Sequence, residues 1–281
     1  MGVLDQIAGW PVGSASAAVV GPDGTVLEAY GDAARPYPLA SVTKPLVALA
    51  VLMAVEEGAL ALDDPAGPQG STVRHLLAHA SGMAPDSPAA VARPGTRRIY
   101  SNAGFEELAL TLANRSGIPF AEYVRAGVLA PLGMTATTFD GSPAAGASSS
   151  VSDLAQFAAE LQGPTLVHAS TMAEASRVAF PDLIGVLPGF GRQEPNDWGL
   201  GFEIRDGKSP HWTGSTSSPA TFGHFGQAGT FLWVDPAAEA ACVVLTDRHF
   251  GSWAAGAWPI FTDAVLSDLR GGDAILRGER N

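Results

Sequence analysis

The stretch "PLASVTKPLVALAVL", residues 38–52, holds one of only two lysines in a chain of 281 residues. The chain uses 14 arginines, so arginine is its usual basic residue. Lysine differs from arginine because a buried lysine amine can lose its proton near neutral pH. Lys44 lies three residues after Ser41 and directly before a proline and a long apolar run. This pattern predicts that Lys44 performs chemistry that an arginine could not.

The apolar run predicts a buried helix that Ser41 opens and that ends near Glu57, before Gly58. Pro45 is tolerated because it lies in the first turn, where N–H groups lack partners within the helix. Positions i and i+3 share a helix face, so the Ser41 hydroxyl and the Lys44 amine can meet. The helix N-terminus and burial both lower the pKa of such a lysine. The spacing therefore predicts a serine nucleophile with an amine base, unless it arose by chance.

Two further motifs lie downstream in "RRIYSNAGF" and "TFGHFGQAGTF". In the first, Tyr100 can pass protons between a nucleophile and a leaving group, as a phenolate beside an ammonium would. Asn102 can hydrogen-bond both the lysine and a substrate carbonyl. The second motif places His224 and Gly226 on a predicted strand. This H-x-G pattern alone is too common to carry a prediction, so its order after the other two motifs is what counts.

The chain shows strand-like segments at both ends and helical segments between them. Residues 16–32 predict a hairpin, and four apolar segments between residues 199 and 247 predict consecutive antiparallel strands. An amphipathic helix is predicted over residues 258–270, and the single cysteine, Cys242, is expected inside a buried strand. Other helices are predicted over residues 72–80, 104–116, 119–130 and 151–161. We therefore predict a discontinuous α/β sheet subdomain, residues 1–58 and 196–281, interrupted by a mainly helical subdomain, residues 59–195.

The motif order S-x-x-K, Y-x-N, H-x-G resembles that of the serine β-lactamase and penicillin-binding-protein superfamily, most closely its class C-like esterase and peptidase branch. Segments such as "TVRHLLAHASGM" and "WGLGFEI" extend the resemblance over roughly residues 15–250. It implies a β-lactamase-like α/β (α+β) fold, with an antiparallel sheet flanked by helices, an all-helical region, and the active site in the cleft between them.

The resemblance also implies a role for each motif residue. Ser41 would be the acylated nucleophile, Lys44 its activating partner, and Tyr100 the general base or acid. Asn102 would orient the substrate, and His224 would occupy the third-motif position. The oxyanion hole would consist of the backbone N–H groups of Ser41 and of Gln227, the residue that follows Gly226.

The chain departs from the family pattern at the third motif. Many relatives carry Lys-Thr-Gly there, and the ammonium helps to receive an anionic carboxylate. His224 is mostly neutral at pH 7, and we expect it to gain charge as the pH falls from 8 to 6. The chain is also shorter than typical class C enzymes. Both departures weaken the β-lactamase and peptidoglycan interpretations.

Composition and motif searches limit the possible partners. The net charge of −12 disfavours nucleic acid and anionic membrane surfaces. The longest apolar run has ten residues, 46–55, and no basic residue precedes Arg35, so we expect a cytoplasmic protein that neither spans a membrane nor carries a signal peptide. His75 and His79 are spaced as a possible metal pair, but no third ligand is evident and we expect them to pack or cap. We expect no metal and no cofactor, because Walker, dinucleotide-binding and H-E-x-x-H motifs are absent from the sequence.

We therefore expect a serine hydrolase that works through an acyl-enzyme on small esters, with β-lactams as weak or incidental substrates. The sequence has no G-x-S-x-G motif, so an α/β-hydrolase is not supported. One alternative is an amide hydrolase, such as a D-amino-acid peptidase, or an acyltransferase with the same site. Another is a catalytically silent relative that binds a ligand. The natural acyl group, the acceptor and the oligomeric state stay open.

Overall fold

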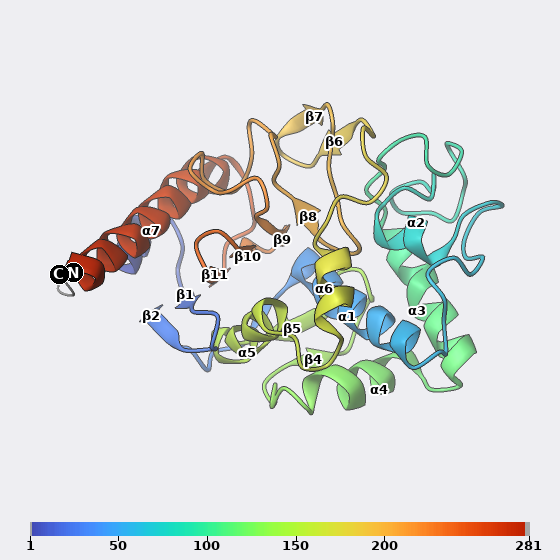
Figure 1. Ribbon diagram of the computed structural model, residues 1–281, viewed down its shortest axis with the longest axis horizontal. Coiled ribbons are helices and arrows are strands. Elements are labelled where there is room, and N and C mark those ends of the chain that lie inside the picture. The colour runs from blue at the N-terminus through green and yellow to red at the C-terminus, as the bar shows by residue number, and fades with distance from the viewer. Residues whose placement is uncertain (1, 279–281) are drawn as a thin grey trace.

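The computed structural model describes residues 2–278, with side chains up to residue 271, and its main element is a six-stranded sheet (Figure 1). The strand order is β2-β1-β11-β10-β9-β8, and every neighbouring pair is antiparallel. The predicted hairpin and the predicted late strands thus join one sheet, with β1 beside β11. The strands are β1 (Ala15–Val20), β2 (Val26–Tyr30), β8 (Glu203–Ile204), β9 (Phe222–Gly226), β10 (Thr230–Asp235) and β11 (Ala240–Thr246).

The central strand β11 is apolar along its whole length because both of its faces are buried. Cys242 and Val244 point into one hydrophobic cluster, whereas Val243 and Leu245 point into the other. Successive side chains of a strand alternate between faces, so a sheet covered on both sides needs apolar residues at every position. The prediction that Cys242 is a buried strand residue is confirmed.

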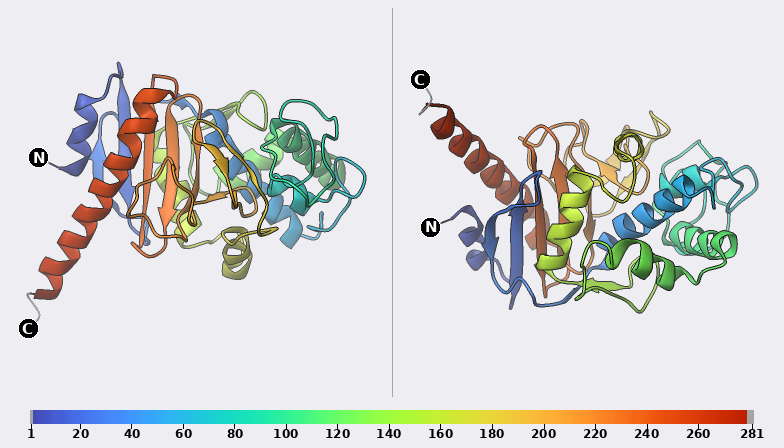
Figure 2. Two further views of the ribbon diagram at one scale, coloured as in Figure 1. Left: turned by 90° about the horizontal axis from the view of Figure 1, so that it is seen from above. Right: turned by 60° about the horizontal axis from the view of Figure 1, so that its bottom comes forward.

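Helices cover both faces of the sheet (Figure 2). On one face, Trp258 and Phe261 of α7 (Ser252–Gly278) pack with Leu4 of the 3₁₀ helix η1 (Val3–Gly9). The predicted C-terminal helix is therefore present, but it begins six residues earlier than expected. On the other face lies α5 (Val151–Gln162), which packs against β1, β10 and β11. α5 thus belongs to the layers around the sheet, although its residues fall in the stretch predicted to be mainly helical.

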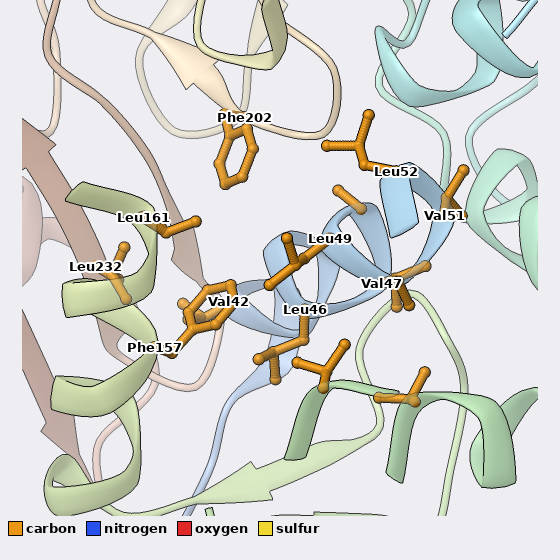
Figure 3. Close-up of a cluster of buried hydrophobic side chains, with 14 of the residues drawn as sticks. Val42, Leu46, Val47, Leu49, Val51, Leu52, Phe157, Leu161, Phe202 and Leu232 are labelled. Carbon is orange, nitrogen blue, oxygen red and sulfur yellow. The ribbon is translucent and has the colours of Figure 1, made fainter. Parts of the chain in front are cut away.

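Helix α1 (Thr43–Glu56) runs through the middle of the molecule and is buried almost all round. Figure 3 shows its side chains pointing outward in several directions, toward Phe157 and Leu161 of α5 on one side and toward Phe202 on another. Burial of each leucine stabilises the fold by about 1.5–3 kcal/mol. This packing fixes the N-terminal end of α1, and with it Ser41 and Lys44, close to the end of β9.

The structure corrects several of the predicted elements. Ser41 does not begin the α-helix: it lies in a 3₁₀ turn, η2 (Ala40–Val42), directly before α1. The helix predicted over 119–130 divides into α4 (Phe120–Val124) and a π-helical turn, η3 (Arg125–Leu129). The other helices are α2 (Val73–Leu77), α3 (Asn102–Ser116) and α6 (Ala169–Ala175), the last of which was not predicted.

Short strands form two small sheets that the sequence did not reveal. One is three-stranded, with order β3-β5-β4, and the other is the hairpin β6-β7. None of these strands exceeds three residues, which is too short for a recognisable alternation. Their bounds are β3 (Tyr37–Pro38), β4 (Thr138–Phe139), β5 (Ala147–Ser149), β6 (Gly185–Leu187) and β7 (Gly191–Gln193). Between residues 2 and 278, no helix combines the length and the apolar character needed to cross a bilayer.

Candidate active site

Ser41 lies where the chain passes closely under the end of β9. A methyl group on Gly226 would come within 2.3 Å of the Leu39 carbonyl oxygen, so only glycine fits there. Thr230 of the next strand donates a hydrogen bond of 2.8 Å to the same oxygen. Ala40 has a left-handed backbone (φ +46°), which is uncommon for a residue with a side chain. The glycine of the H-x-G motif therefore lets β9 approach the turn that presents Ser41.

Lys44 is fully buried and has three oxygen neighbours. Its Nζ donates to Asn102 Oδ1 at 2.8 Å and to the Ala144 carbonyl at 2.9 Å, and it lies 3.2 Å from Ser41 Oγ. Burial lowers the pKa of Lys44 to about 7, although the carboxylates of Asp86 and Glu106 oppose the shift. Because the amide and carbonyl oxygens only accept, the neutral amine directs its lone pair at Ser41.

Asn102 is fixed by both ends of its amide. Its Oδ1 accepts from Lys44, while its Nδ2 donates to Asp86 at 2.8 Å, which settles the orientation of the amide group. Asn102 is the first residue of α3, and Ser101 caps that helix by accepting from the N–H of Gly104. The Y-S-N motif thus lies at a helix N-terminus. The capping residue, Ser101, fixes the backbone on both sides of it and so positions Tyr100 and Asn102.

Tyr100 donates a hydrogen bond of 2.7 Å to Ser41 Oγ, and its ring lies 4.6 Å from Lys44 Nζ. Burial raises the pKa of Tyr100 above its ordinary value, so the side chain is a phenol at neutral pH rather than a phenolate. The segment before it is held by the buried guanidinium of Arg98, which donates to four backbone carbonyls, those of Ala78, Ala179, Phe180 and Asn196.

His224 faces the site from β9 and remains uncharged. Its Nδ1 donates to the Phe225 carbonyl at 2.6 Å, which leaves Nε2 as a buried acceptor without a partner among the described residues. Burial and the nearby charge of Lys44 lower the pKa of His224 to about 3. The expectation that His224 gains charge between pH 8 and pH 6 is therefore wrong, because the ring is desolvated and faces a cation.

The two histidines spaced as a possible metal pair have packing roles. The His79 ring packs 4.5 Å from that of Tyr100, and its Nδ1 accepts from the Ser101 N–H. His75 instead pairs with Thr72 and stacks on Phe180. No cluster of three or more potential metal ligands occurs in the part of the chain that the structure describes.

Ser41, Tyr100, His224 and Gln227 line one small cavity of about 40 Å³. The structure thus brings the predicted nucleophile, the phenol, the third-motif histidine and the predicted oxyanion residue to one place. Lys44 contacts Ser41 directly, whereas Asn102 contacts Lys44 and lines a different cavity, so the predicted substrate-orienting amide is not in the wall of this one. Trp198 was expected in the core or in a cleft wall, whereas the remaining wall residues were not predicted: Leu187, Pro188, Glu203 and Phe225.

Glu203 brings a buried charge to the wall of this cavity. Its carboxylate lies 2.6 Å from Lys208 Nζ and 2.8 Å from His211 Nε2, and the Trp212 indole donates to it. Burial alone would raise the pKa of Glu203, but Lys208 and His211 outweigh it and hold the pKa well below its usual range. The second lysine of the chain is thus a structural partner of Glu203, whereas the first contacts Ser41.

A model of the protein family described as Beta-lactamase matches residues 9–264 of this sequence. The chain belongs to the beta-lactamase family. A crystal structure described as a beta-lactamase from Mycobacterium bovis is 58% identical, covers 95% of this chain and 99% of that one, and superposes with a TM-score of 0.94. The superfamily and the β-lactamase-like fold predicted from the three motifs are therefore confirmed. Members of this family are serine hydrolases.

Curated relatives match over shorter stretches. Penicillin-binding protein 4* from Bacillus subtilis is 29% identical, over 36% of this chain and 30% of that protein. The D-alanyl-D-alanine-carboxypeptidase/endopeptidase AmpH from Escherichia coli K12 is 27% identical, over 37% of each chain. The matches thus span about a third of these family members.

Sequence reasoning missed the backbone and wall residues of the site. Ala144 acts through its carbonyl oxygen, which every residue possesses, so no residue type could reveal it. Leu187 and Pro188 come from the unpredicted β6-β7 hairpin. The charges around Glu203 gave a weak signal, since Lys208 is one of only two lysines.

Proposed function

We propose that this beta-lactamase family member is a carboxylesterase that acts on small esters through an acyl-enzyme on Ser41. One observation carries the proposal: an amine and a phenol converge on the same hydroxyl oxygen, at 3.2 Å and 2.7 Å. An adjacent base and an acid are what a serine nucleophile needs to attack an acyl group and expel an alcohol.

The protonation states support one division of roles during acylation. Because Tyr100 donates its hydrogen to Ser41 Oγ, the serine hydrogen is free to point at the neutral Lys44 amine. Lys44 takes this proton as Oγ attacks the ester carbonyl, and the C–O bond to the alcohol breaks. Tyr100 gives its proton to the departing oxygen, so the step ends with an ammonium, a phenolate, the acyl-serine and a free alcohol.

Deacylation reverses these transfers with water. The Tyr100 phenolate removes a proton from the water that attacks the acyl-serine, and the Lys44 ammonium returns a proton to the Ser41 oxygen as it leaves. The cycle consumes one ester and one water, releases one acid and one alcohol, and restores all three side chains. Opposite charges on Lys44 and Tyr100 between the two steps stabilise each other across the short distance from the ammonium to the ring.

The backbone N–H groups of Ser41 and Gln227 would stabilise the tetrahedral intermediate. Gly226 supports this assignment because its missing side chain lets β9 lie against the turn that carries Ser41. Each such donor contributes about 10²–10³-fold to kcat in other hydrolases.

Two features favour small neutral esters over β-lactams at this site. The uncharged His224 provides no ammonium for a carboxylate beside the reacting carbonyl. The cavity of about 40 Å³ also has room for only roughly three water-sized groups, which suits a short acyl chain. β-Lactam hydrolysis is the second candidate, because the 58% identical relative is described as a beta-lactamase.

Covalent labelling tests the nucleophile. Incubation with a fluorophosphonate should add one label, which peptide mass spectrometry should locate on Ser41. Ser41→Ala should abolish labelling, whereas Ser267→Ala, at an exposed serine of α7, should not. Label retained by Ser41→Ala would overturn the assignment.

A substrate panel tests the ester preference. We expect kcat/KM for 4-nitrophenyl acetate to exceed that for nitrocefin by more than about tenfold, the preference that a missing cation produces. Equal efficiency on both would favour the β-lactam candidate instead.

A further inference from the structure

A second, larger cavity adjoins the reaction cavity and shares two wall residues with it, Tyr100 and Pro188. Its volume is about 500 Å³, within the range of roughly 300–1,000 Å³ that small-molecule sites occupy. It lies between the segment that leads into Tyr100 and the β6-β7 hairpin, which are joined by a bridge between Arg98 and Gly185. The remaining wall residues are Pro85, Arg97, Ile99, Ile184, Val186 and Arg192.

The walls of this cavity are largely apolar and partly exposed. Val186 is 60% exposed and Ile184 is 40% exposed, so both are among the few large apolar side chains left open to water. They stand on or beside β6, whose last residue, Leu187, lines the reaction cavity with Ser41, as does the next residue, Pro188. An apolar group that extends from the reacting ester past Pro188 would bury these side chains.

The charged residues of the cavity are all cationic. Its described lining contains arginines and no carboxylate, in a chain whose net charge is −12. Arg98 is committed to four backbone carbonyls. Arg97 is exposed and has no acidic partner within 4 Å among the described residues, and Arg192 forms an ion pair with Glu194 through Nε. Arg97 and the outer nitrogens of Arg192 therefore remain available to an anion.

On the basis of the proposed function, we infer that this cavity receives the leaving group of the ester, and that the preferred leaving group is an apolar alcohol or phenol with an anionic far end. The leaving oxygen takes its proton from Tyr100, so the group attached to it must lie beside Tyr100. Tyr100 forms a wall of this cavity and of the reaction cavity. The reaction cavity is too small for a bulky group, so the larger half of the substrate goes into the 500 Å³ cavity.

The position of the negative charge matters for this substrate class. At the reacting carbonyl a carboxylate would face the uncharged His224, whereas at the far end of the leaving group it would face Arg97 and Arg192. A third cavity, beside Asn102, carries the opposite charge, with Asp86, Glu106 and Glu107 in its wall. An anion is therefore directed to the arginine side of the site.

Three aryl acetates with leaving groups of similar shape test the charge preference. The probes are 4-acetoxybenzoate, which is anionic, its neutral methyl ester, and the cationic 4-(trimethylammonio)phenyl acetate. The variant Arg97→Gln/Arg192→Gln should lower kcat/KM for the anionic probe about tenfold relative to the neutral one, and it should raise the relative value for the cationic probe. Arg125→Gln, at an exposed arginine of η3, is the matched control and should leave all ratios unchanged. The inference would be overturned if the double variant kept both the anionic-to-neutral and the cationic-to-neutral ratio of kcat/KM within twofold of the wild-type ratios.

Filling the cavity tests its occupant independently of charge. Val186→Trp should lower kcat/KM for the neutral aryl acetate while leaving that for ethyl acetate near the wild-type value, because only the aryl group enters the cavity. Equal effects on both esters would also overturn the inference. Failure of the proposed function itself would look different, since wild type would then hydrolyse none of these esters and Ser41 would take no fluorophosphonate label.

Discussion

The substitution Lys44→Arg keeps a positive charge at the centre of the site but removes the ability of the side chain to give up and accept a proton. A guanidinium keeps its proton at every pH at which a protein folds, whereas burial lowers the pKa of Lys44 to about 7. The wild-type amine is therefore neutral in a large share of molecules at pH 7 and can accept the Ser41 proton. A general base contributes roughly 10²–10⁴-fold, so kcat for a small ester should fall at least about 100-fold in Lys44→Arg.

The stability of the fold provides a control for this substitution. The pKa of Lys44 falls from 10.5 in the unfolded chain to about 7 in the fold, so the unfolded chain binds the proton more tightly. The free energy of unfolding therefore rises with pH between about 7 and 10.5, and at pH 7 the buried lysine costs about 4 kcal/mol. Lys44→Met removes this cost but leaves Asn102 Oδ1 and the Ala144 carbonyl without their donor, at about 1–3 kcal/mol each. We expect Lys44→Met to fold with stability within about 2 kcal/mol of wild type.

Steady-state hydrolysis of 4-nitrophenyl acetate between pH 5 and 9 measures the loss of kcat. Urea unfolding of each variant measures its stability. For wild type, kcat/KM should rise with pH and level off above about 7, as Lys44 loses its proton. Lys44→Arg and Lys44→Met should both be nearly inactive and should lack this rise. Near-normal turnover by a folded Lys44→Arg enzyme would refute the base assignment, as would a flat wild-type profile between pH 6 and 8.

Three other residues give sharp expectations. Tyr100→Phe keeps the ring against Lys44 but removes the proton donor, so kcat should fall about 100-fold with little change in Tm; unchanged kcat would exclude the acid role. The nitrocefin-to-ester ratio of kcat/KM should not change between pH 8 and pH 6, because the pKa of His224 is about 3; a ratio that rises as the pH falls would show that the ring protonates. Glu203→Gln leaves Lys208 buried without its counter-charge, so urea unfolding should show a loss of about 3–5 kcal/mol, and a loss below about 1 kcal/mol would contradict the buried pair.

The parts of this fold that the sequence predicted depend on local spacing. The i, i+3 relation brought Ser41 and Lys44 together even though Ser41 lies in a 3₁₀ turn, since both helix types place these positions on neighbouring faces. The continuous apolar run around Cys242 identified a strand buried on both faces.

The remaining parts depend on contacts between distant segments. Ala144 reaches Lys44 across 100 residues, and each strand of the β6-β7 hairpin has three residues, which is too short for its pattern to stand out. The charge state of His224 could not be predicted either, because it depends on how deeply the fold buries the ring. The sequence alone therefore predicted that Ser41 and Lys44 meet and that burial lowers the pKa of Lys44, but not that burial keeps Tyr100 a phenol and His224 uncharged.

Burial acts on the two proton-transfer groups in opposite directions, and this explains how one site can supply both a base and an acid at neutral pH. Removal from water disfavours the charged form of each group, so it lowers the pKa of Lys44 and raises that of Tyr100. The resting site is then an amine, a phenol, a hydroxyl and a neutral imidazole. A substrate that carried its own charge at the reacting carbonyl would have to lose its hydration without gaining a partner. If the proposed function holds, the same desolvation that activates Ser41 should select substrates that are neutral at the ester and, where they carry a charge, carry it at the far end of the leaving group.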